Sequence, residues 1–263
     1  MKLFDVMYQA CAQMGKLYFG NYAIQSLSPF SVRDTTIRIN EGDYKGGTFF
    51  ALGFNKTFTI ENIDANGIIT FRDSNVATTP TDLSYAITSM DRSTLLNAVN
   101  TALVMMGEHT TFTDIDVTAT DQREFVLDSG IVPVKLEFFN YHNETFGFTF
   151  TNSWSWDLSI KDNKSVITFQ NRILPDETAK VRFWYNAPHG LVINDTDEIN
   201  PDYHTRRLVY ESAYQGYFQF LAREQNSSDR DLMMFQTLIQ ERQAMANIYP
   251  VPRLLHKITL PRN

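Results

Sequence analysis

The alternation of apolar and polar positions is clearest between Asn200 and Ile248, where it predicts two helices of about twenty residues each. Asn200-Pro201 is typical of a helix start, because proline is well tolerated at the first helical position. Asn226–Asp229 is a short polar break, and the prolines after Tyr249 end the second helix, so the two helices are expected to form an antiparallel hairpin. The expected apolar stripes are Tyr203, Leu208, Tyr214, Phe218, Leu221 and Ala222 in the first helix, and Leu232, Phe235, Ile239 and Ala246 in the second.

Two further segments show the same helical period. The first runs from Leu3 to Tyr18, and Gly20-Asn21 is expected to end it. The second is Asp91–Gly107, with Asp91 or Ser93 as its cap and Gly107 as its end. Both helices are expected to pack against the C-terminal hairpin.

Between the first two helices the pattern changes to short β-type runs separated by glycine-rich turns. Asn66-Gly67 is a favoured hairpin turn. These runs predict a small antiparallel β subdomain. Its expected strands are Thr35–Ile39, Thr48–Leu52, Thr57–Ile60 and Gly67–Phe71, with Tyr85–Thr88 as its last strand.

A second β region extends from Thr110 to Asn186, with turn signals spaced as in a sandwich or a curled sheet. Its expected strands are Thr113–Thr118, Arg123–Leu127, Val132–Tyr141, Phe146–Thr151, Ser153–Ile160, Ser165–Phe169 and Ala179–Tyr185.

The predicted fold class is therefore α+β. Residues 1–27, 90–108 and 200–249 are expected to form a helical bundle that ends in the C-terminal hairpin, and 28–89 an inserted β subdomain. Residues 110–188 are expected to form an antiparallel, sandwich-like β domain, and 250–263 an extended C-terminal arm. The arm is apolar and basic, and it contains three prolines.

Composition limits the classes of function. The chain has 263 residues and a net charge of -7, which argues against a protein that gathers nucleic acid by charge. Its one cysteine excludes an intrachain disulfide and a cysteine metal site. We expect no signal peptide and no membrane span, and therefore a soluble protein made in a cytoplasm.

No catalytic motif stands out. The five histidines are scattered, and neither a nucleophile elbow nor a zinc spacing occurs. The acidic stretch Asp195–Glu198 lacks the glycine and the terminal glutamate of a calcium loop, so a solvated loop is expected there. We expect no enzyme, no metal and no cofactor. Trp154 and Trp156 are expected to lie in the core, with a sugar-stacking platform as the alternative.

The order of these elements, with two local sequence patterns, resembles a known family. The first pattern is the helix Leu95–Leu103, which reads Leu-x-Asn-Ala-x-Asn-x-Ala-Leu. The second is Phe183-Trp184-Tyr185 followed by Pro188, an acidic loop and Asn200-Pro201. Over nearly the whole chain this arrangement resembles the neck proteins of tailed bacteriophages, namely the head–tail connector (adaptor) and tail tubular proteins.

The resemblance implies a structural virion protein rather than an enzyme. Such proteins form a homo-oligomeric ring, commonly of twelve subunits, between the portal protein and the tail or the next neck ring. The genomic DNA passes through the ring without sequence recognition, and no membrane is involved. The alternatives are a tail tubular protein and a β-sandwich module that binds a carbohydrate or a receptor on the host.

The ring hypothesis identifies two groups of candidate residues. Charged side chains expected on exposed sides of the hairpin are candidates for the subunit interface: Arg206, Arg207, Glu211, Arg230, Glu241 and Arg242. Residues of the arm are candidates for docking to a neighbouring protein: Val251, Arg253, Leu254, Leu255, Lys257, Ile258 and Leu260.

Overall fold

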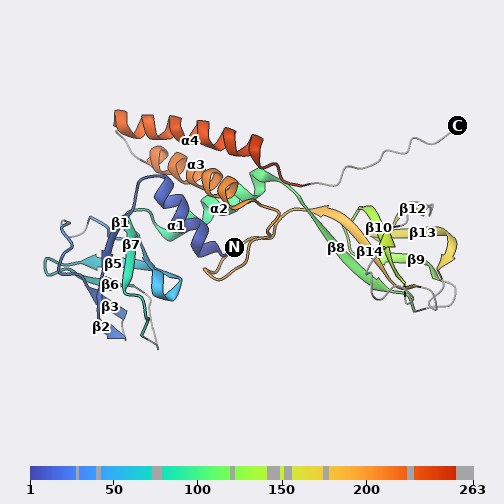
Figure 1. The fold of residues 1–263 in the computed structure, drawn as a ribbon, viewed down its shortest axis with the longest axis horizontal. Coiled ribbons are helices and arrows are strands. Elements are labelled where there is room, and N and C mark those ends of the chain that lie inside the picture. The colour runs from blue at the N-terminus through green and yellow to red at the C-terminus, as the bar shows by residue number, and fades with distance from the viewer. Residues whose placement is uncertain are drawn as a thin grey trace. The chain divides into compact units, whose positions relative to one another are not determined.

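The computed structural model describes residues 1–27, 30–39, 43–72, 79–118, 122–140, 149–150, 156–173, 178–223 and 228–252. The chain divides into two compact units. Unit 1 consists of Met1–Gly107 and His189–Pro250, and unit 2 contains Glu108–Pro188. The fold class is mixed α+β, with antiparallel sheets and a C-terminal pair of helices (Figure 1).

Unit 1 contains a seven-stranded antiparallel sheet in the order β1-β7-β4-β5-β6-β3-β2. Its edge strands β1 and β2 follow each other in the chain, so the sheet curls strongly without becoming a fully closed barrel. Phenylalanine, tyrosine and isoleucine side chains fill the core inside the curl. The strands are β1 (Tyr18–Asn21), β2 (Ala23–Leu27), β3 (Phe30–Arg33), β4 (Thr48–Ala51), β5 (Lys56–Ile63), β6 (Ile68–Phe71) and β7 (Ser84–Thr88).

Four of the five expected strands of this sheet are confirmed, but the strand expected at Thr35–Ile39 is wrong. The buried Asp34 carboxylate accepts hydrogen bonds from the Thr36 backbone N–H and hydroxyl, and these bonds fold the segment into a turn. β7 is the last strand of this sheet along the chain, as expected, and it lies between β1 and β4. The Asn66-Gly67 turn between β5 and β6 is confirmed, with Gly67 at a φ of 73°.

The first helix, α1 (Leu3–Gln13), is shorter than expected. It ends because Gly15 adopts a left-handed conformation with φ of 63°, and the Lys16 backbone N–H bonds the Cys11 carbonyl across this cap. Tyr18 therefore begins β1, and the expectation that Gly20-Asn21 ends the helix is wrong. As a consequence, the sheet begins ten residues before the expected boundary at 28.

The other helices of unit 1 are α2 (Arg92–Met106), α3 (Thr205–Arg223) and α4 (Asp229–Ile248). α2 has the expected bounds, with the Asp91 carboxylate accepting from the Thr94 backbone N–H as its cap. α3 lies between α2 and α4, and α1 packs beside it (Figure 1). α3 approaches its neighbours closely at Gly216, where an added Cβ would lie 3.3 Å from the Met14 sulfur.

α3 begins at Thr205 rather than at Asn200-Pro201. The Asn200 side chain instead accepts a hydrogen bond from the Asp202 backbone N–H, which makes a separate turn before the helix. The second helix follows the polar break as expected, and of the two possible caps, Ser228 and Asp229, it is the Ser228 hydroxyl that accepts from the Asp231 N–H in a capping box.

Unit 2 contains two antiparallel sheets that share one core. One sheet has the order β11-β10-β14-β8 and the other β12-β13-β9. Phe183 of the first sheet contacts Phe125 of the second, and Phe138 contacts Phe169. The strands are β8 (His109–Asp116), β9 (Gln122–Leu127), β10 (Pro133–Asn140), β11 (Thr149–Phe150), β12 (Trp156–Lys161), β13 (Lys164–Ile173) and β14 (Thr178–Ala187). Each of the seven expected strands overlaps a strand of the structure, although the expected ends at Tyr141, Phe146, Thr151 and Ser153 lie outside the described residues.

Candidate functional site

The hairpin of α3 and α4 contains an ion pair between a buried carboxylate and a partly buried guanidinium. The Arg242 Nε of α4 donates to the Glu211 carboxylate of α3 at 2.6 Å, and the Gln215 side-chain amide donates to the same carboxylate. The Arg242 guanidinium also lies 4.4 Å from the centre of the Tyr214 ring. Glu211 is only 6% exposed, so its prediction as an exposed interface residue is wrong. The side chain faces α4 of its own chain, where Arg242 compensates its charge.

A second contact fixes the hairpin to the end of α1. The Asp231 carboxylate accepts hydrogen bonds from the Ser228 and Tyr217 hydroxyls and pairs with the Lys16 ammonium at 3.2 Å. The Ser228 and Tyr217 hydrogen bonds, followed by Lys16, lower the pKa of Asp231. Burial and the bond to Asp231 raise the pKa of Tyr217. The Lys16 ammonium lies 4.0 Å from the centre of the Phe220 ring.

Arg206 and Glu241, both predicted for the interface, line one surface pocket of about 460 Å³ between α1, α3 and α4. Its other lining residues are Gln9, Gln13, Val209, Tyr210 and Met245.

The remaining candidates of the hairpin and arm are scattered. Arg207 donates to the Tyr249 carbonyl at the end of α4, and Arg230 is exposed in the first turn of α4. Val251 is half-buried, and the other predicted arm residues (Arg253, Leu254, Leu255, Lys257, Ile258 and Leu260) lie outside the described part of the chain.

The apolar stripes of the hairpin differ from the predicted ones. α3 buries Leu208, Ala213 and Tyr217, whereas Tyr214 and Phe218 lie against the Phe235 ring of α4 and are only partly covered. Phe218 is 52% exposed although it contacts the Phe235 ring. In α4 the only buried residue is Leu238, because α4 packs chiefly on α3.

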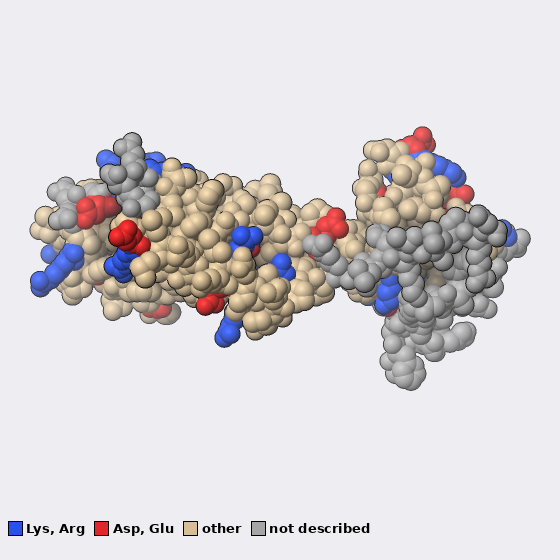
Figure 2. Space-filling view, turned by 90° about the horizontal axis from the view of Figure 1, so that it is seen from above, with Lys and Arg blue, Asp and Glu red and all other residues tan. Residues whose placement is uncertain are grey.

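α4 therefore presents an unusual outer surface, which we call the α4 face. It comprises the exposed residues of α4 from Leu232 to Ile248: Leu232, Met233, Gln236, Thr237, Gln240, Gln243, Ala244, Asn247 and Ile248. The large apolar members are between 48% and 69% exposed, and none of the nine residues is charged. Figure 2 looks down on α4 and shows mostly uncharged surface beyond its first turn. A helix that faces water normally carries charged residues on its outer side, whereas charged residues are depleted at the centres of protein interfaces.

A second uncharged apolar surface lies on α2, which we call the α2 face. It comprises Asn97, Val104 and Met105 of α2 with Leu191 and Ile193 of the adjoining loop. Its four apolar side chains are between 59% and 75% exposed. Asn100 holds the loop on the helix, since its amide donates to the Val192 carbonyl and accepts from the Val192 N–H. The single charged residue of α2 is Arg92.

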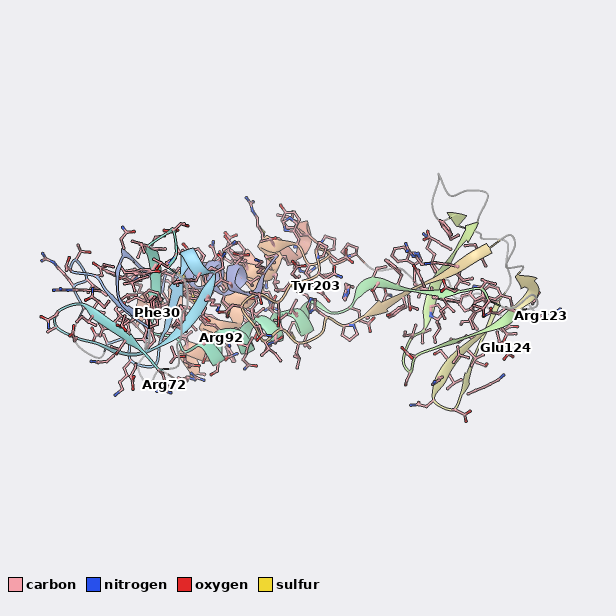
Figure 3. The ribbon with its side chains drawn as sticks, turned by 90° about the horizontal axis from the view of Figure 1, so that it is seen from below. Phe30, Arg72, Arg92, Arg123, Glu124 and Tyr203 are labelled. Atoms are coloured by element: carbon pink, nitrogen blue, oxygen red, sulfur yellow. The ribbon has the colours of Figure 1, made fainter. Side chains whose placement is uncertain are left out.

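The acidic stretch Asp195–Glu198, which precedes α3, bonds to the sheet and to two helices of unit 1. The Asp195 carboxylate accepts from the Thr57 backbone N–H at 2.6 Å and pairs with Arg92 at 2.9 Å. Its backbone carbonyl accepts from the Phe4 N–H at the start of α1. β5, α2 and α1 therefore meet at this loop, beside the labelled Arg92 in Figure 3. The carboxylate is already occupied by protein donors, which gives the acidic stretch a structural role.

Unit 2 carries an aromatic and charged ladder on the outer face of its larger sheet. The Arg182 guanidinium forms a two-pronged pair with Asp114 at 2.8 and 2.9 Å and stacks 3.6 Å from the centre of the Phe112 ring. The Trp184 indole N–H donates to Glu137 at 2.7 Å, and Phe112 lies beside it. Trp156 packs against the core, as expected, and Trp154 lies outside the described residues.

Among the residues that the structure describes, no three His, Cys, Asp or Glu side chains form a metal-binding group. None of the described helices is both long and apolar enough to cross a bilayer. No protein-family model matches the chain, and no curated protein is significantly similar to it in sequence.

The apolar stripes do not predict the α4 and α2 faces, because Leu232 belongs to the predicted stripe of α4 but is 48% exposed, and Val104 and Met105 lie outside any predicted stripe. The sequence signal that could have identified these faces is the lack of charged residues on the outer side of the helix. Gln236, Thr237, Gln240, Gln243 and Asn247 fill the positions where a solvated helix has Lys and Glu.

Proposed function

We propose that this chain is a non-enzymatic structural subunit of a homo-oligomeric ring at the head–tail junction of a tailed bacteriophage. In this role it connects the portal protein to the tail or the next neck ring, within the virion. The observation that carries the proposal is the α4 face, an uncharged and partly apolar surface on a helix with one buried residue. Because helix stability in proteins comes mostly from packing, a helix with so little burial is expected to gain contacts in an assembly.

The resemblance supports the position of the ring in the virion. The two sequence patterns that carry it fall in α2 and in β14 with the loop that leads to α3. The net charge of -7 suits a ring through which DNA passes, since a wall that is not strongly basic does not retain phosphate groups.

The proposal is tested with the purified full chain. Native mass spectrometry and negative-stain electron microscopy should show a closed ring of identical subunits with a central hole. Antibody labelling of virions that contain the chain should mark the junction of head and tail. A chain that remains monomeric at its highest soluble concentration, alone and with the portal protein of the same phage, overturns the proposal.

A second candidate, a receptor-binding module, is favoured by the ladder on unit 2. Phe112 is 43% exposed beside Trp184, and aromatic surfaces of this kind bind sugars and proteins. Its polar groups are, however, already paired with one another, so the ring remains the stronger proposal. Glycan-array binding that is lost in Phe112→Ala, with the melting temperature retained, would support the receptor role. An array without signal removes it.

A further inference from the structure

The α4 face and the α2 face lie on different helices, and α3 separates them (Figure 1). The residues of the α2 face are exposed, whereas Leu95, Val99 and Leu103 of α2 are buried. The residues of the α4 face are likewise exposed, whereas Leu238 of α4 is buried. One subunit therefore offers two separate uncharged surfaces, on two helices that both pack against α3.

We infer that the α4 face of one copy of this chain packs against the α2 face of the next copy, in a head-to-tail contact that repeats around the ring. This inference rests on the proposed ring. Two copies joined by a twofold axis would use one surface on both partners and leave the other face uncovered. A head-to-tail contact covers both faces on every subunit and closes when the rotation between neighbours divides the circle.

The charges of the two faces fit this pairing. Neither face contains Lys, Arg, Asp or Glu, so neither brings an uncompensated charge into the contact. Three charged side chains close to the faces are engaged within their own subunit, while Asp229 and Arg230 are exposed in the first turn of α4, outside the α4 face. Arg242 pairs with Glu211, Asp231 pairs with Lys16, and Arg92 pairs with Asp195.

The two faces also resemble each other in chemistry. Met233 and Leu232 on one side, and Val104 and Leu191 on the other, supply apolar area that water would leave on contact. Gln236, Gln240 and Asn97 are exposed amides that both donate and accept hydrogen bonds. A second copy of the chain is therefore the partner whose surface matches each face.

The experiment uses two charge-block variants of the full chain. Gln236→Lys/Gln240→Lys places two positive charges on the α4 face, and Asn97→Lys/Val104→Lys places two on the α2 face. All four positions are exposed, and lysine is compatible with a helix. The control Gln25→Lys/Ala65→Lys adds the same charge at exposed positions of the seven-stranded sheet. Each species is weighed by native mass spectrometry.

Each block variant alone should be a monomer with the 30.3 kDa mass of one chain, while the control remains a ring. An equimolar mixture of the two block variants should give a dimer of twice that mass and nothing larger. In that dimer one intact α4 face meets one intact α2 face, and the two remaining faces both carry lysines that repel each other.

A third variant, with opposite charges on the two faces, shows whether a lost ring is due to misfolding or to a blocked contact. It combines Gln236→Glu/Gln240→Glu with Asn97→Lys/Val104→Lys, so that opposite charges meet in every contact, and it should restore the ring. If this chain remains a monomer while the parent is a ring, the inference fails.

The other outcomes are equally decisive. A wild-type chain that is itself monomeric refutes the proposed ring. A ring that forms in the wild type and persists in both block variants refutes the pairing of the two faces, although the proposed ring stands. If a ring with lysines on one face then retains DNA, that face borders the channel. A dimer formed by the α2-face variant alone indicates a twofold contact through α4.

Discussion

Arg242 of α4 donates a 2.6 Å hydrogen bond to Glu211 of α3, and Glu211 is the most deeply buried carboxylate of the hairpin. Both residues were expected at a subunit interface, yet they satisfy each other within one chain. Together with the ring contacts to Phe235 and the Tyr217–Asp231 bond, the pair joins the two helices, and removing either partner leaves a charge without compensation.

Arg242→Met should therefore lower the free energy of unfolding by about 2–3 kcal/mol, because it leaves the Glu211 carboxylate buried without its ion-pair partner. The double variant Glu211→Leu/Arg242→Met should recover most of this loss, as apolar side chains of similar size can replace a buried pair. Urea unfolding of the four chains measures the coupling. A change in subunit number without a change in unfolding would place the pair at the interface instead.

The Asp231 carboxylate should make the stability of unit 1 depend on pH. Its pKa is lowered in the folded chain by the Ser228, Tyr217 and Lys16 contacts, so its contribution is fully present above its unfolded pKa of about 3.9. The contribution is lost as the pH falls through the lower folded value. The unfolding free energies of wild type and Asp231→Asn should differ by a constant amount above pH ~5 and converge toward pH ~2. A difference that does not change with pH would contradict the assignment.

The contacts of Asp195 should stabilise unit 1 at the junction of β5, α2 and α1. Asp195→Ala leaves the Thr57 backbone N–H without its acceptor and removes the ion-pair partner of Arg92, which keeps its bonds to the Thr57 hydroxyl and the Ile193 carbonyl, and this should cost about 2–3 kcal/mol. Glu198→Gln is the matched control in the same loop, because Glu198 is exposed, and it should change the stability by less than about 0.5 kcal/mol. Thermal unfolding of the wild type and of both variants measures the two losses of stability. Equal losses would mean that the loop, and not the carboxylate, provides the stability.

The Arg182 ladder should make unit 2 sensitive to an arginine-to-lysine change. Lysine keeps the charge, but it cannot form the two-pronged pair with Asp114 or stack flat on Phe112. Arg182→Lys should cost about 1–2 kcal/mol in unfolding free energy, and Lys180→Arg in the same strand should cost almost nothing because its pair with Asp116 is exposed. A similar loss in both variants would show that strand β14 tolerates no change.

Periodicity predicted most of the elements, but it missed strands β1, β2 and β3 and did not show what each element packs against. The period-two runs predicted every strand of unit 2, because alternation follows directly from a sheet with one buried face. They failed at Thr35–Ile39, where one buried side chain, Asp34, outweighs β propensity by bonding the backbone two residues on. The end of α1 depends on a left-handed Gly15 that the sequence offers equally at Gly20.

The candidate site was less predictable for a related reason. Local sequence identifies which side of a helix is apolar, but burial depends on what packs against it. Phe218 belongs to a good apolar stripe and is half exposed, whereas Glu211 was expected at the surface and is buried. The burial of Glu211 depends on its tertiary contact with Arg242, which is thirty-one residues away in the sequence.

Asn100 should control the loop that supplies half of the α2 face. Its side chain bonds the Val192 backbone twice, so Asn100→Ala should release residues 191–194 and raise their amide hydrogen exchange by about tenfold or more. Asn97→Ala, one turn earlier and exposed, is the control that should leave this exchange unchanged. If the ring uses Leu191 and Ile193, the Asn100 variant should also assemble only at a higher protein concentration. Fast exchange with unchanged assembly would restrict the subunit contact to α2 itself.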